Sequence, residues 1–163
     1  MTQTAFDALP DDGRVWAFAA EPEPGPRATA RLMHAMQDFV HQWTAHRADL
    51  TAAVDWWHHR FLVVGLDESR VGASGCSIDA LMNRLAELEG ELGVRLTESA
   101  PVWYRDAEDR IRSVTREEFR QLAGEGRVGP ETSVFDLTAQ NVGQARRNRL
   151  ERRASESWHA RLL

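Results

Sequence analysis

Two apolar stripes with helical spacing, separated by two short apolar runs, constrain the fold of this chain most strongly. The first stripe has apolar side chains at steps of three and four, namely Leu32, Met36, Phe39, Val40 and Trp43. The second keeps the same spacing from Ile78 to Leu92 and is followed by Gly93, a residue that tolerates the left-handed backbone of a helix end. Each stripe predicts an amphipathic helix with one face toward a core.

Short apolar runs on either side of these helices predict strands. Residues 14–20 form the first run, residues 50–57 and 60–66 form two that are close enough to pair as a hairpin, and residues 100–106 form the last. The hairpin turn falls at His58-His59, which is not favoured turn chemistry, so its register stays open. The order strand, helix, strand, strand, helix, strand predicts an α+β fold for residues 14–106. We expect a ferredoxin-like (split βαβ) antiparallel sheet with two helices on one face.

The remaining residues predict a smaller unit and a tail. Residues 107–138 are expected to form a ββαβ-like unit, with a strand in "RIRSV", a helix capped by Thr115 with Glu118 completing a capping box, and a strand in "TSVFDL". The spacing over residues 102–137 resembles GYF-type bacterial modules, which implies binding of a peptide or protein partner. Residues 139–163 are expected to form an arginine-rich helix or tail whose end, "SWHARLL", docks onto the body.

The composition excludes several classes of function. All 20 Lys+Arg residues are arginine. A Walker A nucleotide site, a pyridoxal enzyme and a protein kinase each need a lysine, and we expect no cofactor. A net charge of −5 gives the chain as a whole no electrostatic reason to bind nucleic acid. The sequence has no run long enough to span a membrane and no signal-peptide pattern at its start, which predicts a cytoplasmic protein.

The only cysteine, Cys76, precedes the second predicted helix in the segment "GASGCSID". If Ser77 caps that helix, the thiol lies beside unpaired backbone N–H groups, whose partial positive charge stabilises a thiolate nucleophile. Asp79 in the first turn would compete for the same N–H groups. The alternative is a buried filler, because free cysteine is among the most buried residue types.

Two histidines are candidates for the base that a cysteine nucleophile needs. His46 follows the first predicted helix and His159 lies in the C-terminal segment, each close to a tryptophan. Asp79 or Asp67 would orient the imidazole. The alternative for each histidine is a surface position beside a packing tryptophan. A metal site built from these side chains is chemically allowed, but no C-x-x-C or H-x-x-x-H spacing supports one, so we expect no metal.

Seven segments carry motifs that resemble those of a protein family. They are "QWTAHRADL", "RFLVVGLDES", "GASGCSIDALMNRLAELE", "VWYRD", "TREEF", "TSVFD" and "SESWHARLL". Together they resemble an uncharacterised family of small cytoplasmic bacterial proteins, prominent in Bacteroidetes, over about residues 14–163. Such proteins are often labelled ABC-transporter ATPases, which the lack of lysine and of a Gly-rich loop contradicts here. The resemblance implies a site drawn from Trp43, His46, Arg60, Ser74, Cys76, Ser77, Asp79, Tyr104, Trp158, His159 and Arg161. The chain departs from the family at Arg47, where the family has glycine, and in "FDLTAQNVGQARRNRLERRASE", where the usual segment is less basic.

One hypothesis and two alternatives follow. The leading hypothesis is a thiol-centred site for hydrolysis or transfer of an acyl or thioester group, or for redox sensing. Cys76 would be the nucleophile, His46 or His159 the base, and Arg60 or Arg161 would bind a small anionic substrate. The first alternative is a non-enzymatic module that binds a peptide or protein, which full burial of Cys76 would favour. The second is a nucleic-acid accessory protein that uses the arginine-rich tail, with an affinity that falls steeply with salt.

Overall fold

The computed structural model describes residues 2–3, 5–97 and 101–163 and divides into two compact units. The first unit comprises residues 1–98 and 139–146, and the second comprises residues 99–138 and 147–163. Both combine helices with largely antiparallel sheets, which confirms the predicted α+β class. No helix within the described ranges is both long and apolar enough to cross a membrane.

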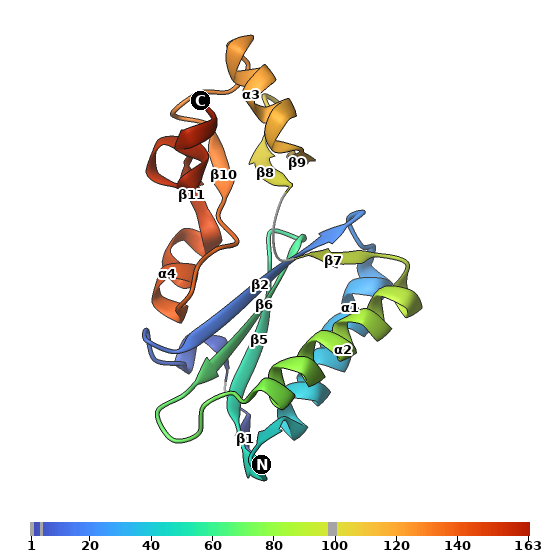
Figure 1. Cartoon of the computed structure of the whole chain (residues 1–163). Helices are drawn as coiled ribbons and strands as arrows, with labels where there is room; N and C mark the ends of the chain where they lie inside the picture. Colours follow the sequence, from blue (N-terminus) through green and yellow to red (C-terminus); the bar gives the residue numbers. More distant parts are fainter. Residues whose placement is uncertain (1, 4, 98–100) are drawn as a thin grey trace. The chain divides into compact units, whose positions relative to one another are not determined.

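A five-stranded sheet in the order β1-β5-β6-β2-β7 forms the centre of the first unit (Figure 1). Its strands are β1 (Thr2–Gln3), β2 (Arg14–Glu21), β5 (Thr51–Trp57), β6 (Phe61–Asp67) and β7 (Arg95–Thr97). The last four pair in antiparallel fashion, and β1 adds a parallel strand at the edge beside β5. The chain order of strands and helices is the predicted one, but β7 takes the place expected for residues 100–106. The ferredoxin-like assignment itself stays a prediction.

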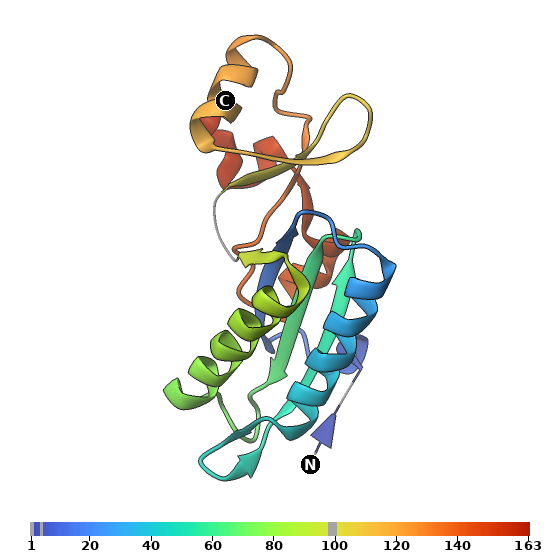
Figure 2. The same ribbon diagram turned by 90° about the vertical axis from the view of Figure 1, so that its right-hand side faces the viewer.

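Two long helices lie side by side on one face of this sheet (Figures 1 and 2). They are α1 (Pro26–Gln42) and α2 (Gly75–Leu92), and both predicted apolar stripes are buried. Buried residues of these stripes, such as Leu32, Met36 and Leu81, pack in one core with alternate residues of the strands, such as Leu62 and Val64. α2 ends at Gly93, whose φ of 67° is the left-handed conformation that the sequence predicts there.

The opposite face of the sheet is covered by the short helix η1 (Phe6–Ala8). Leu62, Val64 and Leu66 of β6 belong to the core under the helices, so Gly65 faces the other way. A Cβ at Gly65 would lie only 2.5 Å from Leu9 and 2.8 Å from Phe6. A side chain at this position would therefore displace η1 from the sheet, because the space is already filled.

The turn between β5 and β6 confirms the predicted hairpin and explains why the sequence left its register open. Trp57 pairs with Phe61, so His58 and His59 lie in the turn itself, with φ values of 56° and 57°. Positive φ at two successive positions is the backbone of a type I′ turn, which favours asparagine and glycine. The two histidines adopt it because the sheet on either side holds the strands in place.

Replacing His59 with glycine is expected to raise the free energy of unfolding by about 1 kcal/mol, because glycine adopts positive φ without steric cost. Urea denaturation measures the change. The matched control is His34→Gly, at an exposed position inside α1, where the same substitution is expected to lower stability because glycine is a poor helix former. A loss of stability in His59→Gly would show that the imidazole contributes more than the backbone strain costs.

The second unit is built on a four-stranded antiparallel sheet in the order β11-β10-β8-β9. Its strands are β8 (Val102–Arg105), β9 (Ile111–Val114), β10 (Ser133–Phe135) and β11 (Glu151–Arg153), with α3 (Arg116–Gly124) between β9 and β10. Thr115 caps α3 as predicted, because its Oγ1 accepts a hydrogen bond from the N–H of Glu118. Three short 3-10 helices, η2 (Arg147–Leu150), η3 (Ala154–Glu156) and η4 (Trp158–Leu162), complete the unit.

The predicted boundary at residue 106 is wrong, whereas the one after residue 138 coincides with a change of unit. β8 belongs to the second sheet, so the first unit does not extend to residue 106. The predicted tail of residues 139–163 is divided between the units. Its first part forms α4 (Val142–Arg146) in the first unit, where the Arg146 guanidinium donates to the carbonyl oxygens of Phe6 and Leu9. Its second part contributes β11 and η4 to the second unit, so the segment is structural and not a free basic helix.

Candidate functional site

A pocket of about 460 Å³ in the first unit brings together residues from the end of α1 and the start of α2. Its lining includes several residues that the sequence singled out and others that it did not: Phe39, Gln42, Trp43, Thr44, Ala45, His46, Ser74, Cys76, Ser77 and Ala80. The two helix ends meet because α1 leads into β5 and α2 follows β6 at the same end of the hairpin, where Thr51 pairs with Asp67.

Trp43 connects the two helix ends. It follows the last residue of α1, is 3% exposed and donates a hydrogen bond from its indole Nε1 to the carbonyl oxygen of Ser77 at 2.8 Å. Its ring packs against Trp16 and Phe39, with ring centroids 5.8 Å and 5.4 Å away. Trp43 therefore fixes the first turn of α2 relative to the end of α1.

His46 lies in a tight turn beside this pocket. The short strands β3 (Thr44–Ala45) and β4 (Ala48–Asp49) form a hairpin whose two turn residues, His46 and Arg47, have φ values of 51° and 65°. Glycine at position 47 would adopt this backbone without strain. The turn keeps its geometry despite arginine, and the His46 side chain is exposed at the pocket.

Ser74, and not Ser77 as predicted, is the N-cap of α2. The Ser74 hydroxyl accepts a hydrogen bond from the N–H of Ser77 at 3.1 Å, and the Ser77 hydroxyl accepts one from the N–H of Ser74 at 2.7 Å, which forms a capping box. The helix thus begins at Gly75, so Asp79 lies beyond its first turn, where there is no acidic residue. Asp79 is exposed and lies three residues after Cys76 on the same helix, so its charge still opposes a thiolate at Cys76.

Cys76 is exposed in the first turn of α2, so the interpretation as a buried filler is wrong. Within the described part of the chain, the backbone N–H groups of Gly75 and Cys76 have no hydrogen-bond partner, since the capping box satisfies only Ser77 and Ser74. Unpaired N–H groups at a helix start carry partial positive charge. An anionic atom at or beside the thiol would be stabilised by them.

Arg60 and Asp67 do not contribute to this pocket. Arg60 precedes β6, at the end of that strand that lies away from the pocket. A strand of seven residues separates Arg60 from the pocket by about 20 Å. It donates to the carbonyl oxygen of Ala20 at 3.0 Å and lies 3.9 Å from Glu23. Asp67 accepts from the N–H of Ser69, and this bond holds the pKa of Asp67 below its usual value. Neither orients His46.

The remaining predicted residues, Tyr104, Trp158, His159 and Arg161, belong to the second unit. His159 is fully buried there, stacked on Trp158 with ring centroids 3.9 Å apart, and its Nδ1 shares a hydrogen bond with the Ser157 hydroxyl at 2.6 Å. An enclosed imidazole of this kind supports packing. Of the two candidate bases, only His46 lines the pocket that contains Cys76.

The sequence missed part of the pocket lining. Phe39 belongs to the apolar stripe of α1, and Gln42 and Thr44 flank Trp43, so their place beside the conspicuous tryptophan was the available signal. In the described ranges, no group of three or more His, Cys, Asp or Glu side chains could hold a metal ion.

Comparison with known proteins gives no match. No family model, no curated protein and no solved structure matches the chain.

Proposed function

We propose that the first unit carries a thiol-centred site in which Cys76 is the nucleophile and His46 the base. The observation that carries this proposal is that the exposed thiol and the imidazole line one pocket, next to unpaired N–H groups at the start of a long helix. A nucleophile, a base and donors for a developing negative charge are the components of acyl transfer.

The chemistry proposed is hydrolysis or transfer of an acyl or thioester group. His46 takes the thiol proton, and Cys76 Sγ attacks the acyl carbonyl carbon. The carbonyl oxygen becomes an oxyanion that accepts hydrogen bonds from the N–H groups of Gly75 and Cys76. The leaving group then departs with the proton from His46, and water or a second acceptor releases the acyl group from sulfur. No arginine lines the pocket among the described residues, while Phe39, Trp43 and Ala80 do, which favours an uncharged acyl group over the anionic substrate expected at first.

The test is the rate of Cys76 alkylation by iodoacetamide at pH 7, followed by mass spectrometry. The folded chain is expected to react faster than the same cysteine in the urea-unfolded chain, by up to about fivefold, because a helix start stabilises a nearby anion by up to about 1 kcal/mol. The assignment is unambiguous because the chain has one cysteine.

Two variants identify the base. His46→Asn removes the imidazole and keeps a residue that tolerates positive φ, so we expect slower alkylation with unchanged folding. His41→Asn, at an exposed position of α1 outside the pocket, is the matched control and is expected to leave the rate unchanged. Equal rates in the folded and unfolded chains would refute the activated thiol, and equal rates in both variants would refute His46 as its base.

A further inference from the structure

A second pocket, of about 570 Å³, lies along β9 in the second unit. β9 is the edge strand of its sheet, and the described ranges contain no strand beyond it. The pocket is lined by the β8–β9 hairpin, by the C-terminal part of α3 and by the loop after it. The lining includes Tyr104, Leu122 and Val128, three arginines (Arg110, Arg112 and Arg127) and two acidic residues (Asp106 and Glu108). It therefore combines apolar side chains with three guanidinium groups, and the two carboxylates contact two of these groups, those of Arg110 and Arg112.

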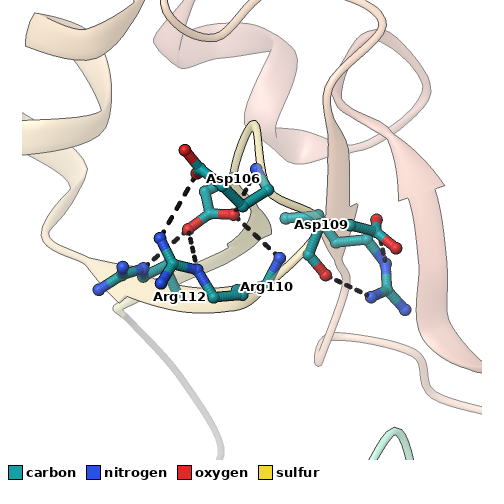
Figure 3. A network of polar contacts seen from close by, with 6 residues as sticks. Asp106, Asp109, Arg110 and Arg112 are labelled. Atoms are coloured by element: carbon teal, nitrogen blue, oxygen red, sulfur yellow. Dashed lines mark hydrogen bonds and ion pairs between the residues drawn. The ribbon is translucent and has the colours of Figure 1, made fainter.

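Asp106 holds two of these arginines in place (Figure 3). Its Oδ2 accepts from Arg112 Nε at 2.9 Å and from Arg110 Nε at 3.3 Å, and its Oδ1 accepts from the N–H groups of Glu108 and Arg110 at 2.9 Å. The hydrogen bond from Arg112, followed by the backbone bond from Arg110, lowers the pKa of Asp106 to about 2. The carboxylate is therefore charged throughout the physiological pH range and keeps both guanidinium groups oriented.

This arrangement leaves the outer nitrogen atoms of the guanidinium groups available. Arg112 uses only Nε for Asp106, and its two Nη atoms have no partner within the described part of the chain. Arg110 reaches Glu108 with one Nη at 3.4 Å, and Arg127 has only Glu125 at 3.7 Å. Arg110 and Arg112 are 60% and 52% exposed. A guanidinium oriented through Nε and open at Nη matches the geometry of an incoming carboxylate.

The edge of β9 offers backbone groups to the same space. The N–H of Asp106 donates to the carbonyl oxygen of Arg110 at 2.9 Å. Because hydrogen-bonded positions alternate along an antiparallel pair, Arg112 faces β8 with its backbone and Ile111 faces outward. An outward-facing backbone at a sheet edge can pair with an extended segment of another chain.

We propose that the β9 groove, defined by Tyr104, Arg110, Arg112, Leu122 and Val128, binds an extended acidic segment of a protein partner. The segment pairs with the outer edge of β9 through its main chain. Carboxylates at alternate positions point to one face of a strand, and there they accept hydrogen bonds from Arg110 and Arg112. Apolar parts of the segment contact Tyr104, Leu122 and Val128. This proposal is independent of the thiol-centred site in the first unit.

The test is an NMR titration of the ¹⁵N-labelled full chain with the peptide acetyl-TVEVEVT-amide and with its glutamine counterpart, acetyl-TVQVQVT-amide. Chemical-shift changes are expected at the amides of β9 and of the loop after α3, and the glutamate peptide is expected to bind more tightly. Arg112→Gln and, separately, Arg110→Gln are each expected to raise the Kd of the glutamate peptide about tenfold, the usual scale for a hydrogen bond to a charged group. Two variants serve because one of them could unfold the hairpin, which the NMR spectrum of the free variant reveals.

Arg120→Gln is the matched control. Arg120 is exposed on α3, the helix that supplies Leu122, but it does not line the pocket. Its Kd is expected to equal that of the unchanged chain. Equal affinity for the two peptides, or an unchanged Kd in both folded arginine variants, would overturn carboxylate recognition. Shift changes centred away from β9 would overturn the edge pairing. No binding of either peptide would overturn the proposal as a whole and show that Arg110 and Arg112 shield the edge from pairing.

Discussion

Replacing Trp43 with alanine is expected to lower the free energy of unfolding of the first unit by about 3–5 kcal/mol, the usual cost of truncating a large buried aromatic residue. Trp43 is 3% exposed, packs against Trp16 and Phe39, and connects the end of α1 to the start of α2 through its bond to Ser77. Urea denaturation gives the total loss. Hydrogen exchange of peptides from α1 and α2 shows whether the loss is located in the first unit.

Trp43→Phe separates packing from hydrogen bonding. This variant keeps an aromatic ring but removes the indole N–H, which leaves the carbonyl oxygen of Ser77 with its helical hydrogen bond alone. We expect a smaller loss, about 1–3 kcal/mol, the cost of one buried hydrogen bond together with the smaller ring. If Trp43→Ala cost less than Trp43→Phe, the ring would be strained in the core, and its connection between the two helices would contribute little to stability.

The helices and the hairpin of the first unit could be predicted because their signals are local. An apolar stripe with helical spacing, a glycine after the last turn and two apolar runs close together each act within a few residues. The same holds for the Thr115 cap of α3. The capping box of α2 is also local, but two serines on either side of Gly75 and Cys76 compete for the N-cap position, and the sequence does not rank them.

The boundary between the units could not be predicted, because it depends on which core an apolar run joins. Residues 102–105 are a good strand candidate for either sheet, whereas β7 is a three-residue strand with the sequence "RLT", too short and too polar to be recognised. The division of the predicted tail is likewise a long-range effect. Arg146 is fixed by carbonyl oxygens of Phe6 and Leu9, about 140 positions away in the chain.

The candidate site was predictable in part, because some of its signals are local. Cys76 and the start of a helix are a local pattern, and Trp43 with His46 is another. Their meeting in one pocket follows from the topology. The C-terminal end of α1 and the N-terminal end of α2 lie at the same end of the hairpin β5–β6. The sequence alone offers no means of choosing between His46 and His159 as the base. His159 is excluded because it is buried in the core of the second unit, and that core forms through long-range contacts.

His159 is expected to make the second unit acid-sensitive. Burial, opposed by Asp136 and assisted by Arg116, lowers the pKa of His159 to about 4 in the folded chain, against about 6.5 in the unfolded chain. The depressed folded value means that the unfolded state takes up the proton first as the pH falls. The stabilising contribution is therefore complete above about pH 6.5 and is lost progressively down to about pH 4, by roughly 2–3 kcal/mol.

Hydrogen exchange of peptides from β8 and β10, measured between pH 7 and pH 4.5 and corrected for the intrinsic exchange rate, reports this loss within the second unit. His159→Phe keeps a ring against Trp158 and Phe119 but cannot be protonated, so its pH dependence over this range is expected to be flatter, whatever its stability at pH 7. His34→Phe, at a site on α1 that is 80% exposed, is the control and should keep the full pH dependence in the second unit. If His159→Phe and the unchanged chain lost stability equally on acidification, the acid sensitivity would lie with the carboxylates of the unit, because His159 would then carry no part of the difference in bound protons between the folded and unfolded states.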